Sequence, residues 1–197
     1  MARASREQTE KNREAIEQAS SRLFRERGLS GVSVAELMAD AGLTHGGFYG
    51  HFASKDALAA QACKRAFEES TARWERRLAR ADGDRKAMLA NLVEPYLSAA
   101  HCANPGIGCA AAALAVDVAR EPAGKPVRQA YADGLRIMVD DMAQTVASDD
   151  PRERHDQALV RMALLVGALT LARATEGDPL SDEMLDAARA HLLGSTG

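Results

Sequence analysis

Residues 43–58, with the sequence LTHGGFYGHFASKDAL, constrain the fold of this chain more than any other segment. Gly42 ends the helix that precedes them, and Thr44 is placed to cap a new helix that runs only to about Gly50. A short helix, a glycine turn and a second short helix together predict a helix-turn-helix. Such a motif needs a further helix to pack against, so the residues before it become informative.

Those residues supply both a packing helix and a clear helix start. The apolar residues of the expected first helix, from Ser5 to Arg27, recur at helical spacing: Ile16, Ala19, Leu23 and Phe24. Ser33 followed by Glu36 matches a capping box, in which each side chain accepts a hydrogen bond from the backbone of the other, and a second helix is predicted from Val34. Residues 1–53 are therefore expected to form a three-helix head.

The rest of the chain also favours helices. Aromatic residues make up only 4% of 197 residues and alanine is abundant, which predicts an all-α fold rather than a sandwich or barrel. Beyond the head we expect a long connecting helix over 55–80 and five more, over about 84–101, 108–120, 126–147, 151–175 and 181–193. About nine helices result, and Pro95 should kink the one that contains it.

Charge and composition exclude several classes of protein. A net charge of −3 argues against indiscriminate coating of nucleic acid, although residues 1–56 are balanced, with eight basic and eight acidic side chains. No apolar run approaches the roughly 20 residues of a membrane span, and the start lacks a secretory stretch, so we expect a cytoplasmic protein without a membrane partner. Three cysteines without CxxC spacing predict neither disulfides nor a metal site.

Two groups of basic residues receive an ordinary interpretation from the sequence. The leading arm, with Arg3, Arg6, Lys11 and Arg13, is expected to be solvated. The cluster Arg73, Arg76, Arg77 and Arg80 on the connecting helix is interpreted as a solvated face rather than as a second binding surface.

The short third helix carries an unusual pair of glycines. Gly46 and Gly47 each destabilise a helix interior by roughly 1 kcal/mol relative to alanine, which a purely structural helix has no reason to carry. Bare backbone permits a close approach, and in a recognition helix the approaching surface is the major groove of DNA. Thr44 and His45 are then best placed to reach base edges. The alternative is a helix-turn-helix used only for packing.

The residues that follow the glycines divide between core and surface. Phe48 and Phe52, four residues apart, are expected to point inward. Tyr49 and His51 then fall on the other side, where both can donate to phosphate oxygens, and Lys55 lies at the start of the next helix, where a cation and exposed amides can meet the DNA backbone.

This combination of motifs resembles the DNA-binding domain of the TetR family of transcriptional regulators. The similarity covers residues 12–60 and is carried by AIEQASSRLFRERGLSGVSVAELMADAGLTHGGFYGHFASKDAL, in which FYGHF followed by SK and an acid is the most recurrent signature. The resemblance implies contacts with an operator in double-stranded DNA from Ser33, Thr44, His45, Gly46, Gly47, Tyr49, His51 and Lys55. Gly50 departs from the larger polar residue often found before the histidine, which affects one expected contact.

The same resemblance implies a ligand-binding and dimerisation body over residues 54–197. Its last two helices, 151–175 and 181–193, would form the interface of a homodimer, and they carry more apolar surface than one exposed helix pair can bury. The alternative is that they complete a monomeric core. An unidentified small molecule is expected to bind the body and lower affinity for the operator, so that the protein is a repressor and not an enzyme.

Candidate ligand-binding residues were chosen mainly for the adaptability of methionine to irregular apolar ligands. They are Met88, Leu92, Tyr96, Cys109, Met138, Met142 and Met162. Ordinary core packing is the alternative explanation for most of them, and no cofactor motif accompanies them.

Cys109 supports a second hypothesis. It falls at the expected start of a helix, where the helix dipole favours a thiolate, and some TetR-type regulators that this chain resembles carry a cysteine after a glycine here and respond to electrophiles or oxidants. A buried, inert cysteine is the ordinary alternative. A remote third interpretation is an enzyme with Cys109 as nucleophile and His101 as base, for which no acid, oxyanion loop or cofactor motif is present.

Overall fold

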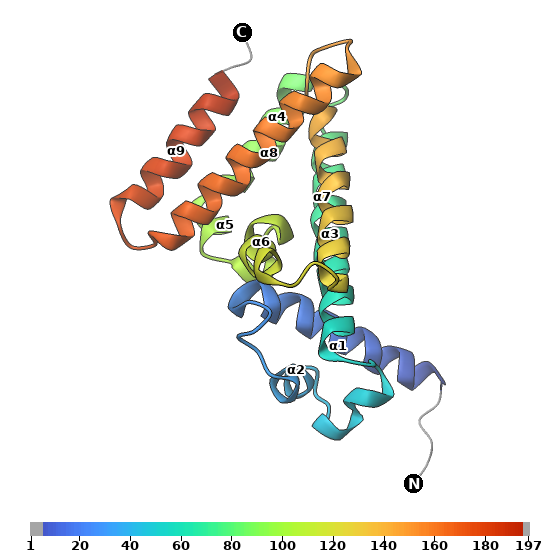
Figure 1. The fold of residues 1–197 in the computed structure, drawn as a ribbon. Helices are drawn as coiled ribbons and strands as arrows, with labels where there is room; N and C mark the ends of the chain where they lie inside the picture. The colour runs from blue at the N-terminus through green and yellow to red at the C-terminus, as the bar shows by residue number, and fades with distance from the viewer. Residues whose placement is uncertain (1–5, 195–197) are drawn as a thin grey trace.

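The computed structural model describes residues 6–194, and every regular element in that range is helical (Figure 1). The predicted all-α class is confirmed. The head consists of α1 (Arg6–Arg27), α2 (Val34–Asp40) and the 3₁₀ helix η1 (His45–Gly50). The expected third helix is thus present as a tighter 3₁₀ helix, in keeping with its length of six residues.

A long helix joins this head to the body. It is α3 (Lys55–Ala79), and it is followed by the body elements α4 (Arg85–Tyr96), α5 (Ala99–Cys102), η2 (Pro105–Ile107), α6 (Ala110–Arg120), α7 (Pro126–Ala143), α8 (Pro151–Ala174) and α9 (Pro179–Gly194). Figure 1 shows α3 and α7 side by side, with α8 and α9 crossing the far end of the body and the head at the opposite end.

Two expected helices are shorter than predicted. The prediction of one kinked helix over 84–101 was wrong, because α4 ends at Tyr96 and a separate helix, α5, begins at Ala99. Ser98 caps α5, and its hydroxyl accepts a hydrogen bond from the backbone N–H of His101. Pro95 lacks an amide hydrogen, and a new cap lies three residues beyond it, so the chain restarts instead of bending. Similarly, α7 ends at Ala143 rather than at Ala147.

The seam between α3 and α7 is unusually close. A Cβ atom on Gly134 would lie 2.2 Å from Cγ of Phe67, so only glycine permits this approach without displacement of the ring. Beside it, the rings of Phe67 and Tyr131 pack edge to face with centroids 5.3 Å apart. This packing makes α3 a rigid connection between the head and the far end of the body.

Helix α8 combines a length of 24 residues with an apolar composition. By length and composition alone it could cross a membrane, contrary to our expectation that no such segment exists, although core helices of soluble proteins pass the same test. One face packs against α9 and α7, and the opposite face leaves Leu159, Val160 and Leu171 exposed. Its composition is therefore explained by two apolar faces, of which one is uncovered in a single chain.

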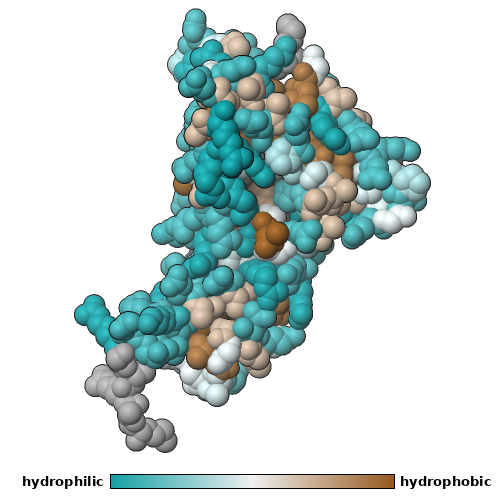
Figure 2. Space-filling model, turned by 180° about the vertical axis from the view of Figure 1, so that it is seen from behind, coloured by the Kyte–Doolittle hydropathy of each residue, from teal (hydrophilic) through white to brown (hydrophobic). Residues whose placement is uncertain are grey.

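The head contacts the body through the C-terminal half of α1. It packs against α3, η2 and α6, and the loop at η2 approaches closely, because a Cβ on Gly106 would lie 2.2 Å from Oε1 of Glu26. Seen from behind, the molecule has a mostly hydrophilic surface, with hydrophobic side chains reaching it in a few places on both the head and the body (Figure 2).

Candidate nucleic-acid interface and body cavity

Local capping places the surface of the head. The Ser33–Glu36 capping box is formed as predicted, with the Glu36 carboxylate accepting from the Ser33 backbone N–H at 2.8 Å and the Ser33 hydroxyl accepting from the Glu36 N–H at 3.2 Å. The Ser33 backbone N–H and the Ser33 hydroxyl both donate to the Glu36 carboxylate and lower its pKa. Gly42 then turns the chain at φ +72°, a conformation that favours glycine, and η1 begins two residues after Leu43.

The outer face of η1 is bare and solvent-exposed. Thr44, His45, Gly46, Gly47 and Tyr49 are all exposed, and the Tyr49 side chain is 75% exposed. A Cβ on Gly46 would meet nothing within 4 Å, and one on Gly47 would meet only the Met38 methyl group at 3.7 Å. Packing within the chain therefore requires neither glycine, which agrees with a backbone kept bare for an external surface.

The inner face of η1 is anchored by aromatic side chains. Phe48 and Phe52 are buried, as predicted, and their rings stack with centroids 6.0 Å apart. Arg13 of α1 donates a hydrogen bond to the His51 carbonyl at 3.0 Å, and its guanidinium lies 4.7 Å from the centroid of the Phe52 ring. The sequence placed Arg13 in a solvated arm, and no local signal marks it as an anchor of η1.

The three other side chains predicted to contact phosphates differ in their burial and in the partners they already have within the chain. Ser33 donates its hydroxyl to the Glu36 carboxylate at 2.7 Å, so a phosphate contact there competes with the capping box. His51 is half-buried, with a buried Nδ1 that has no hydrogen-bond partner among the described residues. Lys55 follows the Ser54 cap and lies with Nζ 6.0 Å from the centroid of the Phe24 ring.

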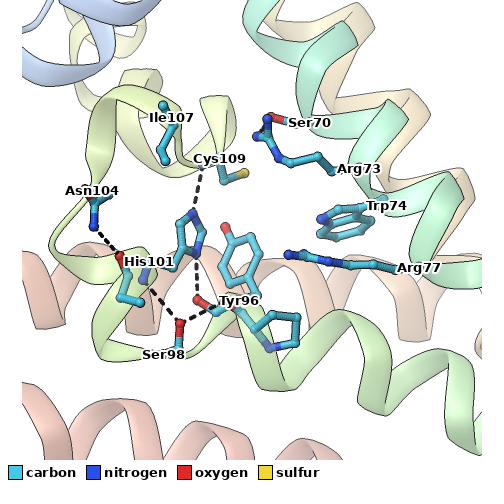
Figure 3. A pocket seen from close by; sticks show the side chains of 12 residues that line it. Ser70, Arg73, Trp74, Arg77, Tyr96, Ser98, His101, Asn104, Ile107 and Cys109 are labelled. Carbon is cyan, nitrogen blue, oxygen red and sulfur yellow. Dashed lines mark hydrogen bonds between the residues drawn. The ribbon is translucent and has the colours of Figure 1, made fainter.

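A cavity of about 320 Å³ opens in the body beside α3 (Figure 3). Residues from α3, α4, α5, η2 and the start of α6 line it: Ser70, Arg73, Trp74, Arg77, Pro95, Tyr96, Ser98, Ala100, His101, Asn104, Ile107 and Cys109. The break between α4 and α5 lies in this wall, so the unpredicted interruption after Pro95 is what shapes one side of the cavity.

His101 is fixed as a neutral side chain in that wall. Its Nδ1 lies 2.7 Å from the Tyr96 carbonyl oxygen, and its Nε2 accepts the backbone N–H of Cys109 at 3.0 Å, so Nδ1 carries the proton. Burial lowers the pKa of His101 to about 4. Because both ring nitrogens are engaged with backbone, this arrangement gives His101 no free lone pair with which to deprotonate the Cys109 thiol.

The interpretation of the α3 arginines as one solvated face was wrong for two of them. Arg76 and Arg80 are exposed, whereas Arg73 and Arg77 are half-buried and line the cavity. Burial lowers the pKa of both, with Arg25 adding to the effect at Arg73. Residues four apart share one helix face, and here that face turns toward the body rather than toward solvent.

One backbone carbonyl connects this cavity to the head. The Gly108 carbonyl accepts a hydrogen bond from Arg73 at 3.2 Å and another from Arg25 of α1 at 3.0 Å. Arg25 is itself buried and forms an ion pair with Glu69 of α3 at 2.7 Å. A movement of the cavity wall at Gly108 therefore acts directly on the helix that supports the head.

Of the predicted ligand-binding residues, the structure brings two together at this cavity, Tyr96 and Cys109. Leu92, Met138, Met142 and Met162 are buried in the hydrophobic core, and Met88 packs against it. Sequence reasoning missed the charged lining, because no periodic signal distinguishes a cavity-facing arginine from a solvated one.

The three cysteines are all buried and unpaired with one another. Burial raises the pKa of Cys63 to about 12, and the side chain packs in the hydrophobic core. Cys109 is the N-cap residue of α6, close to its expected position, and its thiol faces the cavity near Arg73 (Figure 3).

Comparison with known proteins identifies the head by its sequence. Residues 16–62 match the family described as bacterial regulatory proteins, tetR family. The uncharacterized HTH-type transcriptional regulator YerO of Bacillus subtilis (strain 168) is 38% identical over 52 residues, which are 26% of this chain and 18% of YerO. That match thus spans less than a fifth of YerO and is confined to a segment the length of the head.

Solved structures resemble the whole chain in fold. The reduced form of E. coli NemR aligns with a TM-score of 0.76 at 24% identity, covering 92% of this chain and 94% of that chain. A TetR-family regulator from Cytophaga hutchinsonii aligns with a TM-score of 0.77 at 20% identity, covering 98% of each chain. The body, which the sequence match does not reach, therefore has the fold of these regulators as well.

Proposed function

We propose that the chain is a TetR-family DNA-binding transcriptional regulator and that it acts as a homodimeric repressor released from a palindromic operator by a small molecule. We assign DNA binding to residues 1–53 and ligand binding with dimerisation to residues 54–197, in a cytoplasmic protein. Its function is then regulatory rather than enzymatic, and the engaged ring nitrogens of His101 support this.

The exposed face of η1 supports the assignment of DNA contacts. Thr44 and His45 would read base edges, Gly46 and Gly47 would allow the backbone into the major groove, and Tyr49 would donate to a phosphate. Lys55, His51 and Ser33 complete the proposed contacts at the edge of this surface. Positioning by Arg13 and the buried phenylalanines keeps these groups in place before DNA arrives.

The uncovered face of α8 supports the proposed dimer. Val160, Gly167 and Leu171 fall on one side of the helix, Val160 is 68% exposed, and a Cβ on Gly167 would meet nothing within 4 Å. A second copy of α8 and α9, related by twofold symmetry, would cover this face and place two heads on the two halves of a palindrome.

The observation that carries ligand-controlled release is the shared carbonyl of Gly108. A ligand that enters the cavity meets Arg73, which holds this carbonyl from one side, while Arg25 of the head helix holds it from the other. A ligand that binds better to one position of Gly108 than to another would shift the spacing of the two heads, and operator affinity would change by the same free energy.

A test of DNA binding starts by selecting bound sequences from a random duplex library with the full-length protein, which should yield a palindrome. On the selected site, Tyr49→Ala and Lys55→Ala should each weaken binding by about tenfold or more, because each removes a phosphate contact. Lys55→Ala should also lower the salt dependence of binding, because it removes a cation that displaces counterions, whereas Tyr49→Ala should leave that dependence unchanged. Lys86→Ala, at an exposed lysine of α4, is the matched control and should bind normally. Full affinity in both head variants would contradict the assignment.

A second candidate function is sensing of electrophiles through Cys109. Its thiol faces the cavity close to the Arg73 guanidinium, whereas Cys63 lies in the core. In this variant of the mechanism, the Cys109 sulfur adds to the β-carbon of an activated C=C bond, whose π electrons move to the α-carbon. The thiol proton leaves to solvent, solvent returns a proton to the α-carbon, and the adduct displaces the wall at Gly108. The solved structure of NemR is described as its reduced form, so a redox state is relevant to that protein of similar fold.

The thiol hypothesis is tested by measuring release from the selected DNA after treatment with N-ethylmaleimide. Cys109→Ser should keep its DNA affinity and lose the release, while Cys102→Ser, at a buried cysteine outside this cavity, should behave like the unmodified protein. Release of Cys109→Ser by the reagent at an unchanged rate would remove this candidate and leave reversible ligand binding.

A further inference from the structure

The body cavity contains cations without matching anions. The Arg77 guanidinium makes no hydrogen bond or ion pair with any described residue, although it is half-buried. Arg73, four residues earlier on the same face of α3, bonds only to the Ser70 hydroxyl and the Gly108 carbonyl, both at 3.2 Å. Two guanidinium groups therefore face one cavity with most of their donors unused.

No acidic side chain is among the described residues that line this cavity. Glu69 on α3 is the carboxylate that acts on Arg73, but it already pairs with Arg25 at 2.7 Å and with Arg65 at 3.4 Å. Burial and neighbouring arginines lower the pKa of both Arg73 and Arg77, and at Arg73 the charge of Glu69 offsets only part of that effect. The positive charge of Arg73 and Arg77 is therefore not balanced by any described side chain that lines the cavity.

A third donor points to the same space. The Tyr96 side chain is only 1% exposed, and its buried hydroxyl lies beside the Cys109 thiol without any oxygen or nitrogen partner among the described residues. Burial, followed by the neighbouring Cys109, raises the pKa of Tyr96 well above its usual value, so the phenol keeps its proton as a donor. Figure 3 shows the ring standing between His101 and the α3 side chains, with the hydroxyl turned toward the interior of the cavity.

Part of the remaining wall is apolar, although Ser98, His101 and Asn104 also line the cavity. The Trp74 ring packs edge to face on Tyr96 with centroids 6.1 Å apart, and Pro95 lies beside them. Ile107, at 68% exposed, is a large hydrophobic side chain of the lining that reaches solvent. Such a wall suits an aromatic or similarly flat apolar group.

We propose that this cavity binds a small organic carboxylate with a flat apolar body. Its carboxylate accepts hydrogen bonds from Arg73, Arg77 and the Tyr96 hydroxyl, and its body packs against Trp74 and Pro95. This proposal names the chemical class of the effector, and it rests on the proposed function, in which a ligand at this cavity releases the DNA. Recruitment of Arg73 by the carboxylate would weaken its bond to the Gly108 carbonyl and leave that carbonyl to Arg25 of the head.

The chain contains a built-in reporter for this test, because Trp74 is its single tryptophan and lines the cavity. Benzoate is titrated into the full-length protein while Trp74 fluorescence is recorded, and benzamide serves as the uncharged analogue of the same shape. We expect a saturable change with benzoate and binding of benzamide that is weaker by about tenfold or more, since charge-assisted hydrogen bonds are lost.

Variants then locate the charge. Arg77→Gln should weaken benzoate binding by about tenfold or more without loss of folding, because the Arg77 guanidinium has no bond in the free protein. Tyr96→Phe should weaken it less. Arg76→Gln, at the exposed neighbour, is the matched control for the overall positive charge of α3 and should leave binding unchanged.

Three results would overturn the proposal. The first is a titration that stays flat up to about 10 mM benzoate, a concentration at which even weak binding would be measured. The second is equal binding of benzoate and benzamide, and the third is an equal loss of benzoate binding in Arg76→Gln and Arg77→Gln. If the titration is flat while another compound still releases the selected DNA, the proposed function stands without this site; if benzoate binds and operator affinity is unaltered, the anion site stands and the proposed coupling fails.

Discussion

The head surface and the body cavity differ in how they expose their polar side chains, and two tyrosines show this difference. Tyr49 projects from η1 with 75% of its side chain exposed, whereas Tyr96 closes the cavity with 1% exposed and a hydroxyl without an oxygen or nitrogen partner among the described residues. A surface that reads a long rigid polymer must display its groups outward on a firm base. A cavity that recognises a small molecule must withdraw polar groups from water and leave their bonds unmade until the ligand arrives.

The largest expected effect is on the free energy of unfolding, and it distinguishes the buried phenylalanines beneath the head surface from the side chains exposed on it. Phe48→Ala should lower the free energy of unfolding by about 4 kcal/mol, because it empties a fully buried site, while Tyr49→Ala next to it should change that free energy by less than about 0.5 kcal/mol. Chemical denaturation of both variants measures this contrast. Similar losses of stability in the two variants would mean that Tyr49 supports the fold as Phe48 does, which contradicts this distinction.

The next effect concerns the joint between the two regions. Arg25→Ala should destabilise the protein by about 3 kcal/mol, since it removes a buried cation that bonds Glu69 and the Gly108 carbonyl. Arg27→Ala, at an arginine whose ion pair with Glu36 is exposed, should change stability by about 0.5 kcal/mol or less. Thermal unfolding monitored by circular dichroism compares the two variants. Equal melting temperatures would show that the bonds of Arg25 to Glu69 and the Gly108 carbonyl do not stabilise the protein.

A smaller effect appears only in acid and belongs to the cavity wall. His101 is neutral when folded because its pKa is lowered from 6.5 to about 4, so its contribution to stability is complete above pH 6.5 and is lost as the pH falls toward 4. At about pH 5 this loss is about 2 kcal/mol relative to pH 7. Urea denaturation of the unmodified protein and of His101→Gln at both pH values measures it, and the variant should lack that share of the acid sensitivity.

The smallest change in stability should accompany a clear change in DNA binding. Gly46→Ala adds a Cβ that meets nothing within 4 Å, so the free energy of unfolding should change by less than about 1 kcal/mol. If the bare backbone exists for the major groove, affinity for the selected operator should fall by about tenfold. Retention of full affinity would leave the glycine pair without its proposed reason.

The head could be predicted from sequence because its signals are local. The Ser33–Glu36 capping box, the turn at Gly42 and the inward pair Phe48 and Phe52 each depend on residues within one or two helical turns, and each is found as expected. Arg13 was missed because its partner, the His51 carbonyl, lies 38 residues away. A local pattern contains nothing about such a distant acceptor.

The cavity could not be predicted in the same way. Most of the methionines predicted to bind a ligand lie in the core, and Arg73 and Arg77, predicted to be solvated, line the cavity. The charges of Arg73 and Arg77 look the same in sequence as those of Arg76 and Arg80. Only the packing of α4, α5 and η2 against one side of α3 distinguishes them.

By itself, the sequence determined the helical class, the head and the exposed face of its third helix, because periodicity, capping and glycine placement act over a few residues. The tertiary structure decided which charges are buried, where the helix after Pro95 restarts, and that Gly108 joins the cavity to α1. These features depend on contacts between segments far apart in the chain, and the energy of a buried charge is set by its surroundings rather than by its neighbours in sequence.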